Sequence, residues 1–304
     1  MGHAHHHHDH THAADLKGRN LLISIGLNVL ITLAQIIGGL ISGSLALLSD
    51  AVHNLSDVIS LIISYIAQRY SKKEASTHKT FGYKRAEIIA AFVNAATLIV
   101  IAVLLMKEAV ERFLHPQAIA SDLVIWLAVL GIVANGLSVL LLQKDSKGNM
   151  NMRSAYLHLL TDMMASVAVL VGGILMYFFK IYWIDSLLTL AISIYLIVMG
   201  YDLLKSSFKV LMLFSPEDLE IDDLIREVKK LDAIKNIHHV HIWQLNDDEV
   251  HLEAHIDLKN DIKLSAFDAI LLEIEHIAMH YGINHINIQP EYDKDDAKEI
   301  VVQD

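Results

Sequence analysis

Six long apolar segments, separated by short polar ones, dominate the first two thirds of the chain. Each is close to the ~20 residues that an α-helix needs to cross the hydrocarbon core of a bilayer. No apolar stretch of that length follows Phe214. The pattern therefore predicts a transmembrane all-α bundle with six membrane-spanning helices, followed by a soluble domain. The predicted spans are 20–41, 45–68, 86–108, 121–143, 154–179 and 183–206.

In the last third of the chain, the apolar residues occur in shorter stretches that alternate with polar residues. Two alternating stretches at 237–245 and 250–258 predict strands, an amphipathic stretch from Ser265 to His280 predicts a helix, and 283–288 predicts a third strand. Ser215-Pro216-Glu217 is typical of a helix start. The order α-β-β-α-β predicts a compact α+β domain. We therefore divide the chain into a His-rich tail at 1–15, a membrane domain at 16–210 and a cytoplasmic domain at 211–304.

Charge separates the two large parts further. The chain is 54% hydrophobic with a net charge of −11, and from Ser215 onward 22 acidic side chains stand against 8 basic ones. Such an acidic domain argues against a nucleic-acid partner, because its negative charge would repel the phosphate backbone. The chain has no cysteine, which excludes disulfides and thiolate metal sites.

The basic residues of the loops predict how the chain lies in the lipid bilayer. Thirteen lysines and arginines fall on one side of the predicted spans and three on the other. Because cytoplasmic loops collect positive charge, both termini are predicted to be cytoplasmic. The length and the lack of a targeting segment favour a bacterial inner membrane.

Two pairs of ionisable residues interrupt the second and fifth spans. His53 and Asp57 are four residues apart, and so are His158 and Asp162, so each pair lies on one face of its helix. Charged groups are costly in hydrocarbon and usually mark a pathway or a site. Two imidazoles and two carboxylates suit tetrahedral Zn²⁺. Hydrogen-bond glue between helices explains a single such residue better than two pairs.

The charge balance of this set indicates what it does. Two carboxylates with neutral histidines carry two negative charges, which Zn²⁺ cancels and which protons neutralise when the metal leaves. Exchange of zinc for protons across the membrane follows as a hypothesis. An intramembrane zinc hydrolase needs an open coordination position, and a membrane-anchored metal sensor needs no ligands in its spans. Both stay as alternatives. Asp50 is read as polar lining or as a second partner of the site.

The first fifteen residues, MGHAHHHHDHTHAAD, allow two readings. One is a natural tail that collects metal through neutral imidazoles, and the other is an expression tag or a passive tail. Ala4, Asp9 and Thr11 interrupt the histidine run, which favours the first reading.

Two segments carry a resemblance to a known family. GSLALLSDAVHNLSDVIS (43–60) resembles the second span of the cation diffusion facilitators, and HLLTDMMASVAVLVGG (158–173) resembles their fifth. The family's intramembrane site is built from such HxxxD pairs, and the histidine in the first pair resembles zinc-preferring members. The resemblance implies a homodimer that exports Zn²⁺ by proton antiport with alternating access. Because nitrogen and oxygen ligands also accept Cd²⁺ and Co²⁺, these ions are further candidate substrates. The resemblance also implies a metallochaperone-like, ferredoxin-like cytoplasmic domain through which protomers dimerise.

The resemblance extends to the soluble domain. HHVHIWQL (238–245) and HINIQPE (285–291) are similar to two motifs of the family's cytoplasmic domain. They imply a second zinc site, with His238, His241, His255, His285 and Glu291 as candidate ligands. In the loop before the third span, Lys84, Arg85 and Glu87 are predicted to act as interfacial anchors or as salt-bridge partners between subunits.

Overall fold

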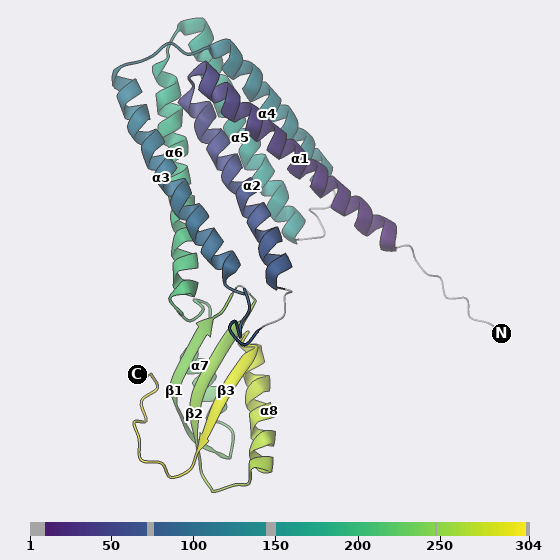
Figure 1. Cartoon of the computed structure of the whole chain (residues 1–304), viewed down its shortest axis with the longest axis vertical. Helices are drawn as coiled ribbons and strands as arrows, with labels where there is room; N and C mark the ends of the chain where they lie inside the picture. The colour runs from purple at the N-terminus through teal and green to yellow at the C-terminus, as the bar shows by residue number, and fades with distance from the viewer. Residues whose placement is uncertain (1–9, 72–75, 144–149, 247, 302–304) are drawn as a thin grey trace, which may run out of the picture. The chain divides into compact units, whose positions relative to one another are not determined.

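A computed structural model describes residues 10–71, 76–143, 150–246 and 248–301. Each of the six predicted spans is part of a helix in it (Figure 1). These helices are α1 (His10–Ser42), α2 (Leu45–Ser71), α3 (Ala86–Leu114), α4 (Ser121–Leu142), α5 (Met150–Phe179) and α6 (Trp183–Leu211). Of the predicted His-rich tail, residues 1–9 lie outside the described part, and the backbone of 10–15 begins α1.

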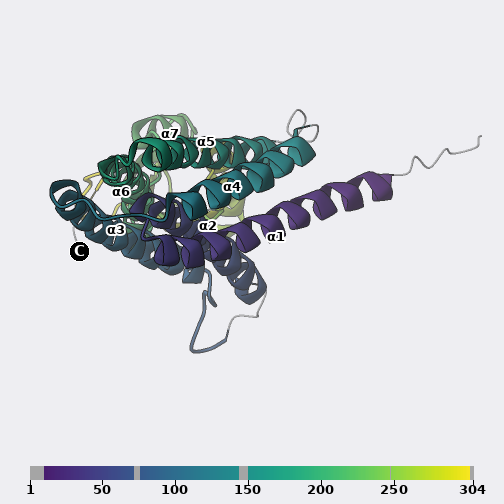
Figure 2. The same cartoon turned by 90° about the horizontal axis from the view of Figure 1, so that it is seen from above.

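The chain divides into two compact units, which we describe separately. The first contains residues 1–63 and 93–202, and in it α4 packs against both α5 and α1 (Figure 2). Small residues allow this close packing: a Cβ added to Gly38 would collide with Leu127. Large apolar side chains such as Leu40, Trp126 and Leu140 point outward and are mostly exposed. An apolar exterior over a tightly packed interior is what a bilayer solvates.

Length and hydropathy agree with a multi-pass membrane protein. Among the described residues, α3, α4, α6 and residues Tyr156–Phe179 of α5 are long and apolar enough to cross a bilayer, and Gly26–Ser42 of α1 is a shorter apolar helix. The prediction of a helical membrane domain is confirmed.

The second unit contains residues 64–92 and 203–304, and its centre is the predicted α+β fold. Its elements are α7 (Ile221–Val228), β1 (Ile234–Gln244), β2 (Val250–Leu258), α8 (Leu264–His280) and β3 (His285–Glu291). The sheet order is β1-β2-β3, with β2 antiparallel to β1 and parallel to β3. The predicted order α-β-β-α-β is therefore confirmed.

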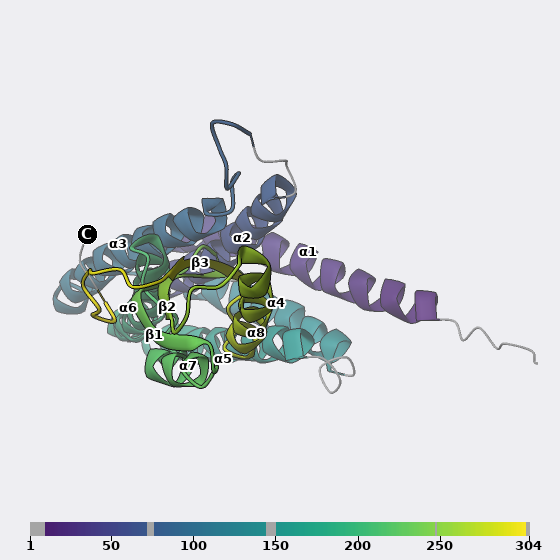
Figure 3. The same cartoon turned by 90° about the horizontal axis from the view of Figure 1, so that it is seen from below.

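One face of this sheet forms the core of the unit. Helices α7 and α8 cover that face (Figure 3) and bury Ile237, Ile256 and Ile274 completely. Because side chains alternate along a strand, the neighbouring His238, His255 and Asp257 point to the opposite face. The apolar positions thus decide which face presents the histidines.

Two of the boundaries that differ from the sequence prediction have a local physical reason. The helix predicted to begin at Ser215-Pro216-Glu217 begins instead at Ile221, and residues 216–219 form a turn closed by the Leu219 amide on the Pro216 carbonyl. The apolar residues that anchor the helix to the core, Leu224, Ile225 and Val228, start only there. Strand β3 continues to Glu291, three residues beyond its predicted end, because Asp257 on β2 still pairs with it.

Candidate metal centres

The bundle brings the two predicted His/Asp pairs together between α2 and α5. His53 Nε2 lies 3.7 Å from Asp57 Oδ2 and 3.6 Å from Asp162 Oδ1. His158 Nε2 lies 3.2 Å from Asp57 Oδ2 and 3.6 Å from Asp162 Oδ2. His53, His158 and Asp162 place ligand atoms within 4.8 Å of one another, and Asp57 contacts both histidines.

These separations suit one specific geometry. Nitrogen and oxygen ligands about 2.0–2.2 Å from a tetrahedral Zn²⁺ lie roughly 3.3–3.6 Å from one another. The four separations above run from 3.2 to 3.7 Å. Each contact between a histidine and a carboxylate therefore has about the spacing of two neighbouring ligands in a zinc coordination shell.

The burial of Asp162 agrees with a cation as its partner. Its side chain is 1% exposed, and neither carboxylate oxygen has a hydrogen-bond partner among the described residues. A buried carboxylate is costly unless a positive charge or a donor compensates it. Only the His53 and His158 rings lie within ion-pair distance of it in the described part of the chain. A divalent metal would supply the missing compensation.

A short hydrogen-bonded chain lies beside this site. Gln35 of α1 donates through Nε2 to Asp50 Oδ2 at 2.8 Å, and Asn54 donates to Gln35 Oε1 at 3.2 Å. Asp50 is thus held by α1, in agreement with its reading as a supporting polar group. The ring of Tyr195, which no motif indicated, lies 5.8 Å from the ring of His53.

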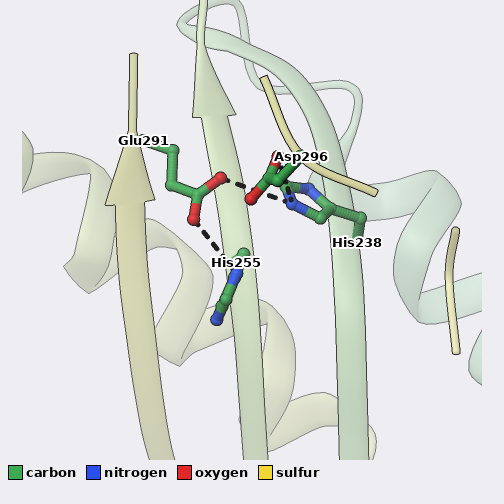
Figure 4. Close-up of side chains that lie close together, drawn as sticks. All are labelled: His238, His255, Glu291 and Asp296. Carbon is green, nitrogen blue, oxygen red and sulfur yellow. Dashed lines mark ion pairs between the residues drawn. The ribbon is translucent and has the colours of Figure 1, made fainter. Parts of the chain in front are cut away.

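A second cluster lies on the polar face of the β1-β2-β3 sheet. His238, His255, Glu291 and Asp296 place ligand atoms within 4.8 Å of one another (Figure 4). Strand register explains three of them: His238 on β1 pairs with His255 on β2, and Asp257, two residues further along β2, pairs with Glu291 on β3. Asp296 comes from the segment that follows β3.

The distances and protonation states of these side chains favour binding of a cation. His238 Nε2 lies 3.4 Å from Glu291 Oε2, and His255 Nδ1 lies 3.1 Å from Glu291 Oε1. Desolvation lowers the pKa of His255, which favours the neutral imidazole that binds metal. Burial acts to raise the pKa of Glu291, but hydrogen bonds from Lys294, Gln289 and Lys298 outweigh it and keep this pKa below its usual value.

Two of the five candidate cytoplasmic ligands lie outside this cluster. The ring of His285 is 4.5 Å from that of His251, and the ring of His241 is 5.0 Å from that of His239. The register explains this separation for His285, which begins β3 six residues before Glu291. Asp257, whose Oδ2 lies within ion-pair distance of His238 Nδ1 at 3.5 Å, was missed.

Asp296 was also missed by the sequence analysis. It lies in the acidic run DKDD (293–296), whose position against the sheet no local pattern indicates. In the loop before α3, Lys84 contacts another segment of the same chain. Lys84 forms a salt bridge of 2.6 Å with Glu249 of the same chain, and the Phe81 ring lies 5.9 Å from the His251 ring. Lys84 thus has a partner within its own subunit.

Comparisons with known proteins cover both units. Residues 21–212 match the family model of the cation efflux transmembrane domain, and residues 216–293 match that of the cation efflux protein cytoplasmic domain. A cadmium, cobalt and zinc/H⁺-K⁺ antiporter of Bacillus subtilis is 39% identical over 96% of this chain and 92% of the relative. The zinc transporter ZitB of Escherichia coli is 35% identical, over 96% of this chain and 93% of its own length. The metal cation efflux system protein CzcD of Cupriavidus metallidurans is 33% identical, over 91% and 89%.

Proposed function

Because the chain belongs to the cation efflux family, we propose that it exports Zn²⁺ from the cytoplasm in exchange for protons. The family match confirms the resemblance to the cation diffusion facilitators. In this proposal residues 16–210 form the transport domain of a homodimer in a bacterial inner membrane, with both termini in the cytoplasm. Residues 211–304 form the cytoplasmic domain for metal binding and dimerisation.

One observation carries the proposal. His53 and His158 each lie 3.2–3.7 Å from a carboxylate oxygen of both Asp57 and Asp162, within a bundle of apolar helices. Zinc is the substrate of this site, bound between α2 and α5. A set of two carboxylates and two neutral imidazoles around Zn²⁺ has no net charge, so the loaded site is compatible with a medium of low dielectric constant.

Proton exchange follows from the empty site. When the metal leaves, two carboxylates lose their compensating charge, and protons on the histidines or carboxylates restore it. Histidine suits this role because its ordinary pKa is about 6.5. Access to the site from one side of the membrane at a time then couples the two fluxes, and the inward gradient of protons drives zinc outward.

The ligand set of this site is compatible with more than one divalent metal. Nitrogen and oxygen ligands also accept Cd²⁺ and Co²⁺, and affinity alone does not select among these ions. The names of the relatives include cadmium, cobalt and zinc. We propose zinc as the main substrate, with cadmium and cobalt as further ones.

Transport is favoured over the two alternatives. A zinc hydrolase keeps a coordination position open for water, whereas the proposed site uses four protein groups as ligands. A membrane-anchored sensor does not need the ligands in α2 and α5. The matching family models and the named relatives are those of transport proteins.

The test is metal flux in proteoliposomes. Purified protein is reconstituted with a zinc dye and a pH dye inside, and an imposed pH gradient should drive zinc uptake that changes with the size of the gradient. Asp57→Ala should reduce the flux at least ~10-fold, because it removes a ligand. Asp122→Ala, at an exposed position in the first turn of α4, is the matched control and should keep it.

The same vesicles test which ion is exchanged for zinc. One relative is named for exchange with potassium as well as protons. Replacing potassium by choline should leave zinc flux unchanged if protons are sufficient. Zinc flux that ignores the pH gradient, or an Asp57→Ala variant with full flux, would refute proton-coupled transport through this site.

A further inference from the structure

A lysine lies where the cytoplasmic metal is proposed to bind. Lys298 Nζ is 2.8 Å from Asp257 Oδ1, 3.3 Å from Glu291 Oε2 and 3.5 Å from His238 Nε2, and it also pairs with Asp296. An ammonium group has three donors, and here three carboxylates receive them. Among the atoms it touches are His238 Nε2 and oxygens of Glu291 and Asp296, from three of the four residues of the metal cluster.

The backbone holds this lysine in place. After β3 ends at Glu291, the chain reverses at Asp293, whose φ of 53° lies in the left-handed region that aspartate tolerates better than most residues. The returning segment runs beside β1, where the carbonyls of Glu299 and Ile300 accept hydrogen bonds from the amides of His239 and Val240 at 3.1 and 2.7 Å. These bonds are made by the two residues that directly follow His238.

The net charge of the cluster can be compared with Lys298 present and with Zn²⁺ in its place. Three carboxylates, Asp257, Glu291 and Asp296, face two lysines, Lys294 and Lys298, which leaves one net negative charge. Exchange of Lys298 for Zn²⁺ makes the cluster neutral. Lysine and metal cannot both occupy this volume, because each needs the same carboxylate oxygens.

From this geometry we propose that Lys298 is a built-in competitor of the metal. Its ammonium group holds the cytoplasmic cluster in a metal-free form, and zinc binds by displacing it, with His238, His255, Glu291 and Asp296 as ligands and with release of residues 297–301 from β1. The inference rests on the proposed metal binding by this domain, and it adds the element that sets how much zinc is needed.

Competition of this kind has a measurable size. The apparent dissociation constant of a ligand rises by the factor by which the competent form is depleted. Three charge-assisted hydrogen bonds to a partly exposed lysine correspond to a depletion of order ~10-fold. The lysine therefore raises the zinc concentration at which the cytoplasmic domain responds.

Zinc binding to the full-length protein in detergent tests this. Isothermal titration is carried out in an Asp57→Ala background, and the part of the signal that His238→Ala abolishes is assigned to the cytoplasmic cluster. Lys298→Met and Lys298→Gln should both tighten this binding ~10-fold. Lys259→Met removes an exposed lysine that forms no ion pair in the described part of the chain, and it should change nothing. Asp296→Asn should weaken binding.

The outcomes separate the inference from the proposed function. If His238-dependent binding exists and neither Lys298 variant tightens it, the competitor role is wrong while metal binding stands. If no variant, including those at Lys298, shows His238-dependent binding, the proposed cytoplasmic site itself fails. Hydrogen exchange tests the release: zinc should speed exchange at the His239 and Val240 amides, and unchanged exchange would overturn release of the segment.

Discussion

His158 Nε2 on α5 lies closer to Asp57 Oδ2 on α2, at 3.2 Å, than to Asp162 Oδ2 of its own helix, at 3.6 Å. His53 likewise lies 3.6 Å from Asp162 and 3.7 Å from Asp57. The two His/Asp pairs are therefore interleaved across the helix interface. Because each histidine depends on the carboxylate of the other helix, a shift of α5 along α2 would dismantle the site, which is what a transporter needs in order to release its substrate.

Asp162→Asn tests the buried carboxylate without changing its shape. We expect zinc flux to fall at least ~10-fold, since the amide cannot supply the negative charge that balances Zn²⁺. We also expect the metal-free protein to keep or raise its melting temperature, because the variant removes a buried carboxylate whose oxygens accept no hydrogen bond among the described residues. Proteoliposome flux and thermal unfolding in chelator measure the two effects.

The control is Asp122→Asn on the exposed face of α4, which should alter neither quantity. A loss of flux together with a large loss of stability in Asp162→Asn would assign the carboxylate a structural role and would contradict its role as a ligand.

His53→Asp should widen selectivity toward cadmium. A carboxylate can bind a metal through two oxygens, which suits a larger ion with a higher coordination number than tetrahedral zinc. Competition flux with mixed zinc and cadmium measures the ratio of the two rates, and His115→Asp, in the exposed segment after α3, serves as control. Strict zinc preference in His53→Asp would show that the residue does not control the choice.

Features that depend on a residue pattern within one segment could be predicted from the sequence. Apolar runs located all six helices, and the i, i+4 spacing selected four residues that the fold brings together. The sequence could not predict contacts that depend on distant segments meeting. The helix start at Ser215-Pro216 was wrong because local capping chemistry matched, while the apolar residues that anchor a helix begin later. Asp296 and Lys298 reach the cluster only through the chain reversal after β3.

Asp185 of α6 is a further example, and it makes a prediction. Its carboxylate accepts hydrogen bonds from Ser44 Oγ at 2.5 Å and from the Leu45 amide at 2.7 Å, so it caps the N-terminus of α2 from another helix. Asp185→Ala should lower the free energy of unfolding by about 2 kcal/mol, because buried amides lose their acceptor. Thermal unfolding of the detergent-solubilised protein measures this. Since α2 carries His53 and Asp57, flux should fall as well. An unchanged melting temperature would contradict the capping role.

The Lys84–Glu249 salt bridge joins the loop before α3 to the start of β2. Both side chains are about one third exposed, so we expect a double-mutant cycle of Lys84→Met and Glu249→Gln to give a coupling energy of at most ~1 kcal/mol. The coupling should disappear in 1 M salt, which screens exposed charges. Thermal unfolding of the four proteins at low and high salt measures it. A coupling that persists in high salt would indicate a contact other than a charge pair.

Zinc binding should release protons, and the number released should fall as the pH rises. Metal binds neutral imidazoles and ionised carboxylates, so protons on these side chains must leave before Zn²⁺ can bind, and fewer of these protons are present at pH 8 than at pH 6. A His238→Ala background isolates the transport site, and a pH dye in weakly buffered detergent counts the protons at each pH. In Asp162→Asn, which should not bind zinc, the release should disappear. Equal release at both pH values would mean that the histidines do not carry the exchanged protons, and the coupling would have to be assigned to other groups.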